Sequence, residues 1–298
     1  MHHPHRSTVV ITPPTAEPCT VTEFMTQLGI TAPTDPTQAQ ALSTQLLNLL
    51  LAAREDVENY TRRALMLQTR ELRLDCFPFR DRRYGHARRW EHGHSILLPF
   101  APLMAIVSFT FTDFEGNTCT VAYDSSYGTA ENLPAWTYQR SLGTETLPGR
   151  LEPGRFRFWP WAGEGEDVVR IRFRCGYGGP VQVTTTAESA VIASPMVFTQ
   201  DDVNRPICIP NAGAEGANNN PTTLVTSIAS VDENGNATLT NPASAAVENV
   251  NANYGIKVPE PIRQAILILA QSYFNNGFGS DMPAFVAARL KPYCNWTS

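Results

Sequence analysis

A stretch near the N-terminus constrains the fold most, because it carries the spacing of a long α-helix. Asp35 can cap exposed amides, Pro36 suits the first helical position and Gln38 can complete a capping box. Apolar residues then recur every three or four positions, which places them on one helical face. They are Leu42, Leu46, Leu49, Ala53, Val57, Tyr60 and Ala64. We therefore predict a helix from Pro36 to about Arg63.

Further leucines widen this apolar stripe near the middle of the helix. They are Leu47, Leu50 and Leu51, and they lie beside the main stripe rather than on it. A helix that is apolar over more than one face is covered on more than one side. We expect either the chain's own fold or a neighbouring subunit to supply the second cover.

A second helix of the same kind is predicted near the far end, from Pro261 to about Asn276. Its stripe comprises Ile262, Ile266, Leu269 and Tyr273. Shorter helices are predicted after the capping box Thr20-Val21-Thr22-Glu23 and from Pro283 to Leu290. Between the long helices the apolar period changes from 3.6 to 2, which is typical of strands. We predict an α+β fold, with a helical core formed by the two ends of the chain.

Strands are predicted in two blocks between the helices. In the first block they lie at 69–74, 95–99, 106–112, 119–123, 149–159 and 168–175. The second block, from Gly179 to Gly255, holds seven acids and one base, Arg205, in a chain of net charge −5. So sharp a shift in composition predicts a separately folded all-β insert, with strands at 182–186, 207–209, 224–231 and 237–240. The predicted organisation is an N-terminal arm with core helices (1–67), a β-rich middle region (68–178), the inserted module (179–256) and C-terminal helices with a tail (257–298).

Several classes of protein are excluded by what the sequence lacks. No run of about 18 apolar residues predicts a membrane span, and the polar first residues are not those of a signal peptide. The six cysteines are scattered and form no C-x-x-C pair, which favours isolated thiols in a reducing compartment over disulfides or a zinc site. None of the common catalytic, phosphate-binding or dinucleotide-binding motifs occurs. We predict no enzyme, catalytic residue, cofactor or metal; a Cys/His hydrolase assembled by the fold is the alternative.

One loop, from Phe77 to His94, is unusually basic. Its arginines, Arg80, Arg82, Arg83, Arg88 and Arg89, are interleaved with Tyr84 and Trp90. Arginines with aromatic residues suit phosphate contact plus base stacking. The alternatives are a solvated hairpin tip or a loop that pairs with a neighbour's acids. Three histidines in the loop, His86, His92 and His94, lack a further ligand to complete a metal site.

The order of several short segments resembles one protein family. A long helix leads into Tyr60-Thr61-Arg62-Arg63-Ala64-Leu65, and later come Ile96-Leu97-Leu98-Pro99, Cys175-Gly176-Tyr177-Gly178 and Val258-Pro259-Glu260-Pro261-Ile262. This order resembles the head–tail connector (adaptor) proteins of long-tailed bacteriophages, over roughly residues 7–178 and 256–293. The family usually runs from the Gly-Tyr-Gly segment almost directly into the last helix, whereas about 75 residues intervene here.

The resemblance implies a structural virion protein at the neck, made in the host cytoplasm. Such adaptors are similar in forming a ring, usually twelve-fold, beneath the portal protein, and in joining the next neck or tail-completion protein. Packaged double-stranded DNA passes through the lumen, where the five loop arginines are the DNA-channel candidates. Leu47, Leu50, Leu51, Phe285, Tyr293 and Trp296 are the candidate subunit or portal contacts. The alternative function is a soluble nucleic-acid-binding protein that uses the loop 80–94.

Overall fold

The computed structural model describes residues 6–78, 95–124, 136–142, 147–154, 158–163, 165–216, 220–277 and 282–294. The chain divides into two compact units. Unit 1 comprises Met1–Pro13, Gln68–Cys175 and Phe198–Asp202, and unit 2 comprises Pro14–Leu67, Gly176–Val197 and Val203–Ser298. Helices, open sheets and a closed barrel occur together, which confirms the predicted α+β class.

The described residues form four α-helices, all in unit 2, and local signals set their ends. They are α1 (Val21–Leu28), α2 (Pro36–Thr61), α3 (Glu260–Asn276) and α4 (Ala284–Leu290), followed by the 3₁₀ turn η2 (Lys291–Tyr293). The Asp35 side chain accepts a hydrogen bond from the Thr37 amide at 2.8 Å and caps α2. The predicted capping box of Thr20 and Glu23 starts α1, and left-handed Gly29 ends it. The helix predictions are confirmed.

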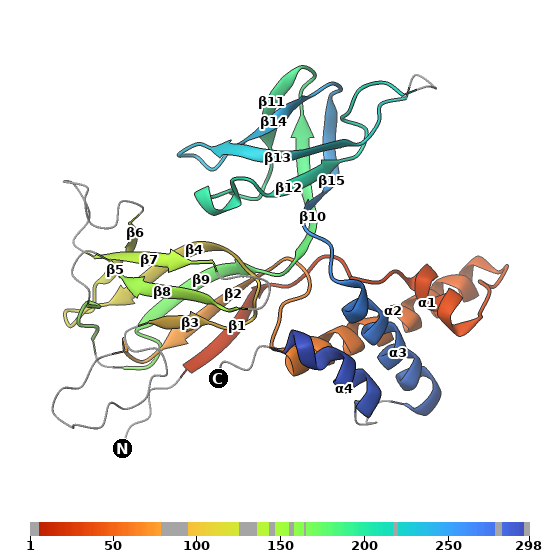
Figure 1. The fold of residues 1–298 in the computed structure, drawn as a ribbon, viewed down its shortest axis with the longest axis horizontal. Coiled ribbons are helices and arrows are strands. Elements are labelled where there is room, and N and C mark those ends of the chain that lie inside the picture. The colour runs from red at the N-terminus through yellow and green to blue at the C-terminus, as the bar shows by residue number, and fades with distance from the viewer. Residues whose placement is uncertain are drawn as a thin grey trace. The chain divides into compact units, whose positions relative to one another are not determined.

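The helical core joins the two ends of the chain, as Figure 1 shows for α2 and α3. Buried side chains of α2 and α3 share one apolar cluster: Leu46, Leu50, Ala53, Val57, Ile262, Ala265, Ile266 and Leu269. Of the predicted stripe of α2, Leu46, Ala53 and Val57 are buried, whereas Leu42, Leu49 and Tyr60 are only partly buried. Leu50 is buried in place of Leu49. Leu50, predicted as an interface candidate, is 1% exposed and therefore belongs to the core.

Unit 1 contains two sheets. The larger has the order β1 (Arg6–Thr12), β2 (Gln68–Leu74), β9 (Val169–Cys175), β4 (Leu103–Thr112) and β5 (Thr118–Thr120), with every neighbouring pair antiparallel. The smaller has the order β3 (Ile96–Leu98), β8 (Gly149–Pro153), β7 (Thr137–Ser141) and β6 (Ala122–Tyr123). The N-terminal stretch that we grouped with the helices thus supplies a sheet edge, and β7 was not predicted.

Aromatic side chains fill the core of unit 1. The Trp159 ring stacks on Phe77 with centroids 5.3 Å apart, and Phe109 and Phe111 also contact Phe77. The aromatic residues next to Trp159 in the sequence divide between core and surface. Trp159 is buried, whereas Phe158 and Trp161 are mostly exposed.

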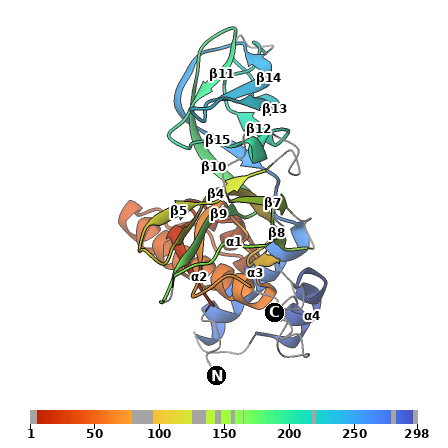
Figure 2. The same cartoon turned by 90° about the vertical axis from the view of Figure 1, so that its left-hand side faces the viewer.

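The predicted insert is a closed six-stranded barrel, visible in Figure 2. Its strands are β10 (Gly178–Thr185), β11 (Ser189–Ala193), β12 (Pro206–Ile209), β13 (Leu224–Val231), β14 (Ala237–Ala243) and β15 (Val247–Gly255). Apolar side chains from these strands point inward, among them Val183, Ile192, Ile207, Ile228 and Leu239. Neither β11 nor β15 was predicted. Closure removes every strand edge from this part of the chain.

One short piece of the acidic region folds with unit 1 instead of the barrel. It is Phe198–Asp202, which contains the 3₁₀ turn η1 (Gln200–Asp202) between β11 and β12. The Asp202 carboxylate pairs with Arg174 of β9 at 2.5 Å, and Asp201 pairs with Arg140 of β7. The Ile106 amide of β4 also donates to Asp201 at 3.1 Å. The acidic region is therefore more than a self-contained module.

Glycines at the start of the barrel are required by close backbone approach. Gly176 has φ +117°, and a Cβ there would lie 2.2 Å from the Met66 carbonyl oxygen. At Gly178 a Cβ would lie 2.4 Å from the Tyr254 carbonyl oxygen. These glycines are therefore positions of close backbone packing and not a flexible connection.

Two hairpin turns, one in each unit, share a five-residue pattern. In both an aspartate, Asp113 or Asp232, accepts hydrogen bonds from the amides two and four residues later, at 2.8–2.9 Å. The fourth residue, Gly116 or Gly235, has positive φ. Hydrogen bonds to the ionised form lower the pKa of both carboxyl groups. The sequences of both turns, Asp113 to Asn117 and Asp232 to Asn236, carry the Asp, Asn and Gly residues that are typical of hairpin turns.

Candidate assembly surfaces

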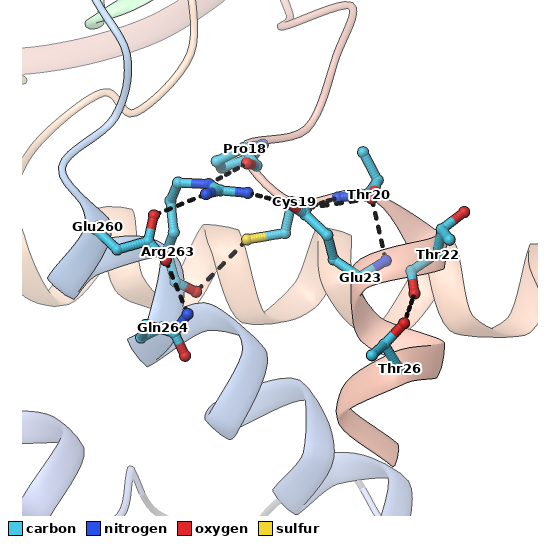
Figure 3. A network of polar contacts seen from close by, with 9 residues as sticks. All are labelled: Pro18, Cys19, Thr20, Thr22, Glu23, Thr26, Glu260, Arg263 and Gln264. Atoms are coloured by element: carbon cyan, nitrogen blue, oxygen red, sulfur yellow. Dashed lines mark hydrogen bonds and ion pairs between the residues drawn. The ribbon is translucent and has the colours of Figure 1, made fainter. Parts of the chain in front are cut away.

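A guanidinium group fastens the N-terminal arm to the last long helix, as Figure 3 shows. Arg263 of α3 donates to the Glu23 carboxylate at 2.5 Å, the Glu260 carboxylate at 2.7 Å and the Pro18 carbonyl at 2.8 Å. The Thr20 amide and then Arg263 lower the pKa of Glu23. Residues about 240 positions apart in the sequence are thereby held in one place, which positions α1 beside α3.

A thiol lies under this clamp. The Cys19 thiol donates to the Arg263 carbonyl at 3.5 Å and is almost fully buried. Burial raises the pKa of Cys19 to about 12, so the group stays protonated near neutral pH. A neutral, buried thiol is a packing element and not a nucleophile.

A second polar network closes the C-terminal end of α2. Arg54 pairs with Glu17 at 2.8 Å and with Glu58 at 3.0 Å, and the other Glu58 oxygen accepts from the Leu65 amide at 2.7 Å. Desolvation raises the pKa of Glu17, and the charge of Arg54 opposes that shift. All three charged side chains are largely buried, so they hold the chain where it leaves α2 instead of facing a partner.

A third buried arginine connects this region to the C-terminal segment. Arg63 donates to the Tyr177 hydroxyl at 3.1 Å and to the Tyr293 carbonyl. The Tyr293 ring is half-buried, and its backbone is held against the end of α2. Trp296, which lies just beyond, is outside the described residues.

The outer face of the first two thirds of α2 lacks charged side chains. The 18 residues from Pro36 to Ala53 contain no charged side chain, although the first half of this helix is exposed on Gln38, Gln40, Thr44, Gln45, Leu47 and Asn48. A solvated helical face normally carries charges. Depletion of charge with retained apolar and amide side chains marks the buried part of protein interfaces.

The predicted contact residues include exposed, half-buried and buried side chains. Leu47 is 39% exposed on α2 and Phe285 is 64% exposed on α4, so both present apolar surface. Leu51 is half-buried, and Leu50 offers no surface. The five arginines of the DNA-channel prediction, Arg80, Arg82, Arg83, Arg88 and Arg89, lie outside the described residues, as do His86, His92 and His94.

Among the described residues, no group of histidine, cysteine or acidic side chains could hold a metal ion. The thiols of Cys76, Cys119 and Cys294 have pKa values raised by burial, as Cys19 has. No helix among the described residues is long and apolar enough to span a membrane.

Comparison with solved structures shows a similarity at the level of the fold. The chain is similar to a chain in "Virion of native gene transfer agent (GTA) particle", with a TM-score of 0.50, 16% identity, and coverage of 97% of this chain and 95% of that chain. Similarity to a chain in "Neck of empty GTA particle computed with C6 symmetry" has a TM-score of 0.49 at 17% identity, covering 98% and 95%; that value is too low to establish a common fold. No family model and no curated protein matches the chain.

Proposed function

We propose that this chain is a structural protein of the neck of a phage-like particle, where copies form a closed head-to-tail ring. The observation that carries this proposal is the fold shared with a virion protein over nearly the whole of both chains. The order of sequence segments that resembles phage adaptors supports the same role independently.

The ring contact that we propose joins the outer face of α2 in one copy to the α4 region of the next. The charge-free stretch of α2, Pro36 to Ala53, exposes Leu47, and α4 exposes Phe285; these are different surfaces of one chain. A contact between unlike surfaces is heterologous and closes into a ring when the rotation per copy divides a full turn. We propose twelve copies, on the resemblance to adaptors.

The partners follow from the same proposal. A ring at the neck meets the portal protein on one face and the next neck or tail-completion protein on the other, and double-stranded DNA passes through its lumen. We assign the five arginines from Arg80 to Arg89 to the lumen, because arginine contacts phosphate without regard to sequence. No catalytic step is part of this role.

The test is ring formation by the purified chain, observed by electron microscopy and analytical ultracentrifugation. Leu47→Asp removes apolar contact and places a charge in the proposed interface. In the proposed contact, the 39% of Leu47 that is exposed in the single chain becomes buried. Without that burial the free energy of association falls by about 1–2 kcal/mol, at ~25 cal/mol per Å². Desolvating the new carboxylate adds to this, so each contact weakens by more than about tenfold.

Asn59→Asp is the matched control, since Asn59 is an exposed α2 residue beyond the charge-free stretch. We expect rings from the wild-type chain and from Asn59→Asp, and none from Leu47→Asp at the same concentration and helix content. If Leu47→Asp forms rings and is as stable as the wild-type chain, α2 is not part of the ring interface. A chain that is absent from the neck of particles would overturn the function.

A further inference from the structure

Strand β1 is a long, unprotected sheet edge. It pairs with β2 on one side, and in the described part of the chain no strand pairs with its other side. Half of the amide and carbonyl groups of an antiparallel edge strand point away from the sheet. The backbone of β1 can therefore accept another strand.

The side chains of β1 favour such pairing. Five consecutive β-branched residues, Thr8 to Thr12, follow Arg6 and Ser7, and no charge interrupts them. Val9, Val10 and Ile11 are each about 40% exposed. Uncharged β-branched segments of six residues or so have the composition that pairs most readily between chains.

Other strand edges in the described residues are protected by being short. β5 and β3 have three residues each and β6 has two, and the barrel has no edge. Natural proteins keep edges short, place lysine, proline or a charge on them, or introduce a β-bulge, to avoid pairing between molecules. β1 has seven residues and no lysine, proline or charge from Ser7 to Thr12; its register against β2 shifts once, between Val10 and Thr12.

We propose that two copies of this chain, outside the particle, pair edge to edge through β1, antiparallel about a twofold axis. The occupant is a second copy because β1 is the one long open edge that the described chain offers. Antiparallel pairing places the two Arg6 side chains at opposite ends, whereas a parallel pair would place them together. Full overlap of the seven residues puts Val9 opposite Val9.

This contact is distinct from the proposed ring. A twofold contact uses the same surface on both copies and closes after two, so it cannot propagate around a head-to-tail ring. The proposed dimer forms between unassembled chains, and its β1 pairing covers the β1 edge until the chains assemble into the ring. The dimer does not use α2, so its test is independent of the ring.

The first test uses Val9→Lys. Val9 lies opposite Glu71 in the β1–β2 register. Glu71 already pairs with Arg73 and Arg172, so thermal unfolding of Val9→Lys is compared with wild type to show that the sheet is retained. In the dimer the two lysines would face each other, which is destabilising. Val107→Lys is the matched control, because Val107 is similarly exposed in the same sheet, on β4, which lies between β9 and β5.

We expect a concentration-dependent dimer in sedimentation equilibrium for wild type, for Val107→Lys and for Leu47→Asp. Val9→Lys should weaken dimerisation by at least tenfold. Amides of residues 7–12 should gain protection from hydrogen exchange as concentration rises. The proposal is overturned if the wild-type chain is monomeric at every concentration, which includes the case in which β1 binds only another protein. It is also overturned if both lysine variants lose dimerisation equally.

A second test locates the axis. Single Ser7→Cys, Val9→Cys and Ile11→Cys variants are oxidised at a concentration that favours the dimer, with wild type as control for the native thiols. The position opposite itself forms the intermolecular disulfide, and we expect Val9→Cys to do so. No enhancement over wild type at any of the three positions contradicts an antiparallel β1 pair.

Discussion

Removal of the Asp202 carboxylate should destabilise unit 1 strongly. Asp202 is fully buried and accepts from Arg174 at 2.5 Å and from the Thr199 amide at 2.7 Å. The Arg174 side chain is only 5% exposed, and its other two nitrogens have no hydrogen-bond partner within the described residues. Asp202→Ala therefore leaves a buried, uncompensated guanidinium, which costs about 3–5 kcal/mol.

Tryptophan fluorescence is the assay suited to this prediction. Four of the five tryptophans, Trp90, Trp136, Trp159 and Trp161, lie in the range Gln68–Cys175 of unit 1. Urea unfolding followed by fluorescence thus reports mainly on that unit. With a denaturant slope near 2 kcal/mol per M, the midpoint should fall by roughly 1.5–2.5 M.

Two further variants decide whether the cost comes from the orphaned charge. Replacing both partners, Arg174→Leu with Asp202→Ala, removes the charge as well and should recover at least half of the loss. Glu248→Ala, at an exposed barrel acid, should leave the fluorescence midpoint unchanged. A double variant as unstable as the sum of the single ones, or an Asp202→Ala shift below about 0.3 M, refutes the reasoning.

Three other predictions concern the backbone, a turn and a thiol. Gly176→Ala should lower the free energy of unfolding of unit 2 by at least about 2 kcal/mol, because its Cβ would meet the Met66 carbonyl and its φ is positive. Gly116→Ala also has positive φ but open space around the Cβ, so it should cost only about 1 kcal/mol. Thermal unfolding measures both. Hydrogen bonds within the turn lower the pKa of Asp232 in the folded state. The stability that its ionised form contributes is present above the unfolded pKa and is lost as pH falls through the folded pKa; NMR titration of the carboxyl should give a lower midpoint in the folded chain than in the urea-unfolded chain. Cys19, with a pKa of about 12, should resist alkylation at pH 8 until the chain unfolds, as measured by mass spectrometry.

Helices and tight turns were predictable because their signals are local. Asp35 caps the amides two and three residues ahead, and Asp113 organises a turn that ends four residues later. Such contacts need no knowledge of the remaining chain. The same local logic placed α3 and α4 within one residue of their observed starts.

Strands with unfavourable composition were not predictable. β15 is rich in asparagine and carries a glutamate, which local propensity disfavours in a strand. It is a strand because β10 and β12 pair with its two edges and close the barrel. β7 likewise depends on its neighbours β6 and β8.

The candidate contact surface was only partly predictable. Periodicity could not separate Leu47 from Leu50, since both widen the stripe of α2, and only packing against α3 buries Leu50. The absence of charge from Pro36 to Ala53 was the available signal for an outer interface. The clamp at Arg263 had no signal, because its partners Glu23 and Pro18 are remote in the sequence.

By itself, the sequence determined the helices, their caps and the turns, because these depend on neighbours within a few positions. It also determined the α+β class and the distinct character of the acidic region, because these depend on periodicity and composition. Tertiary structure alone decided which strands pair, that Phe198–Asp202 joins the sheet unit through Arg140 and Arg174, and which leucine of α2 faces outward. These outcomes depend on burial and on partners more than 20 residues away. Such contacts exist only once the chain has folded.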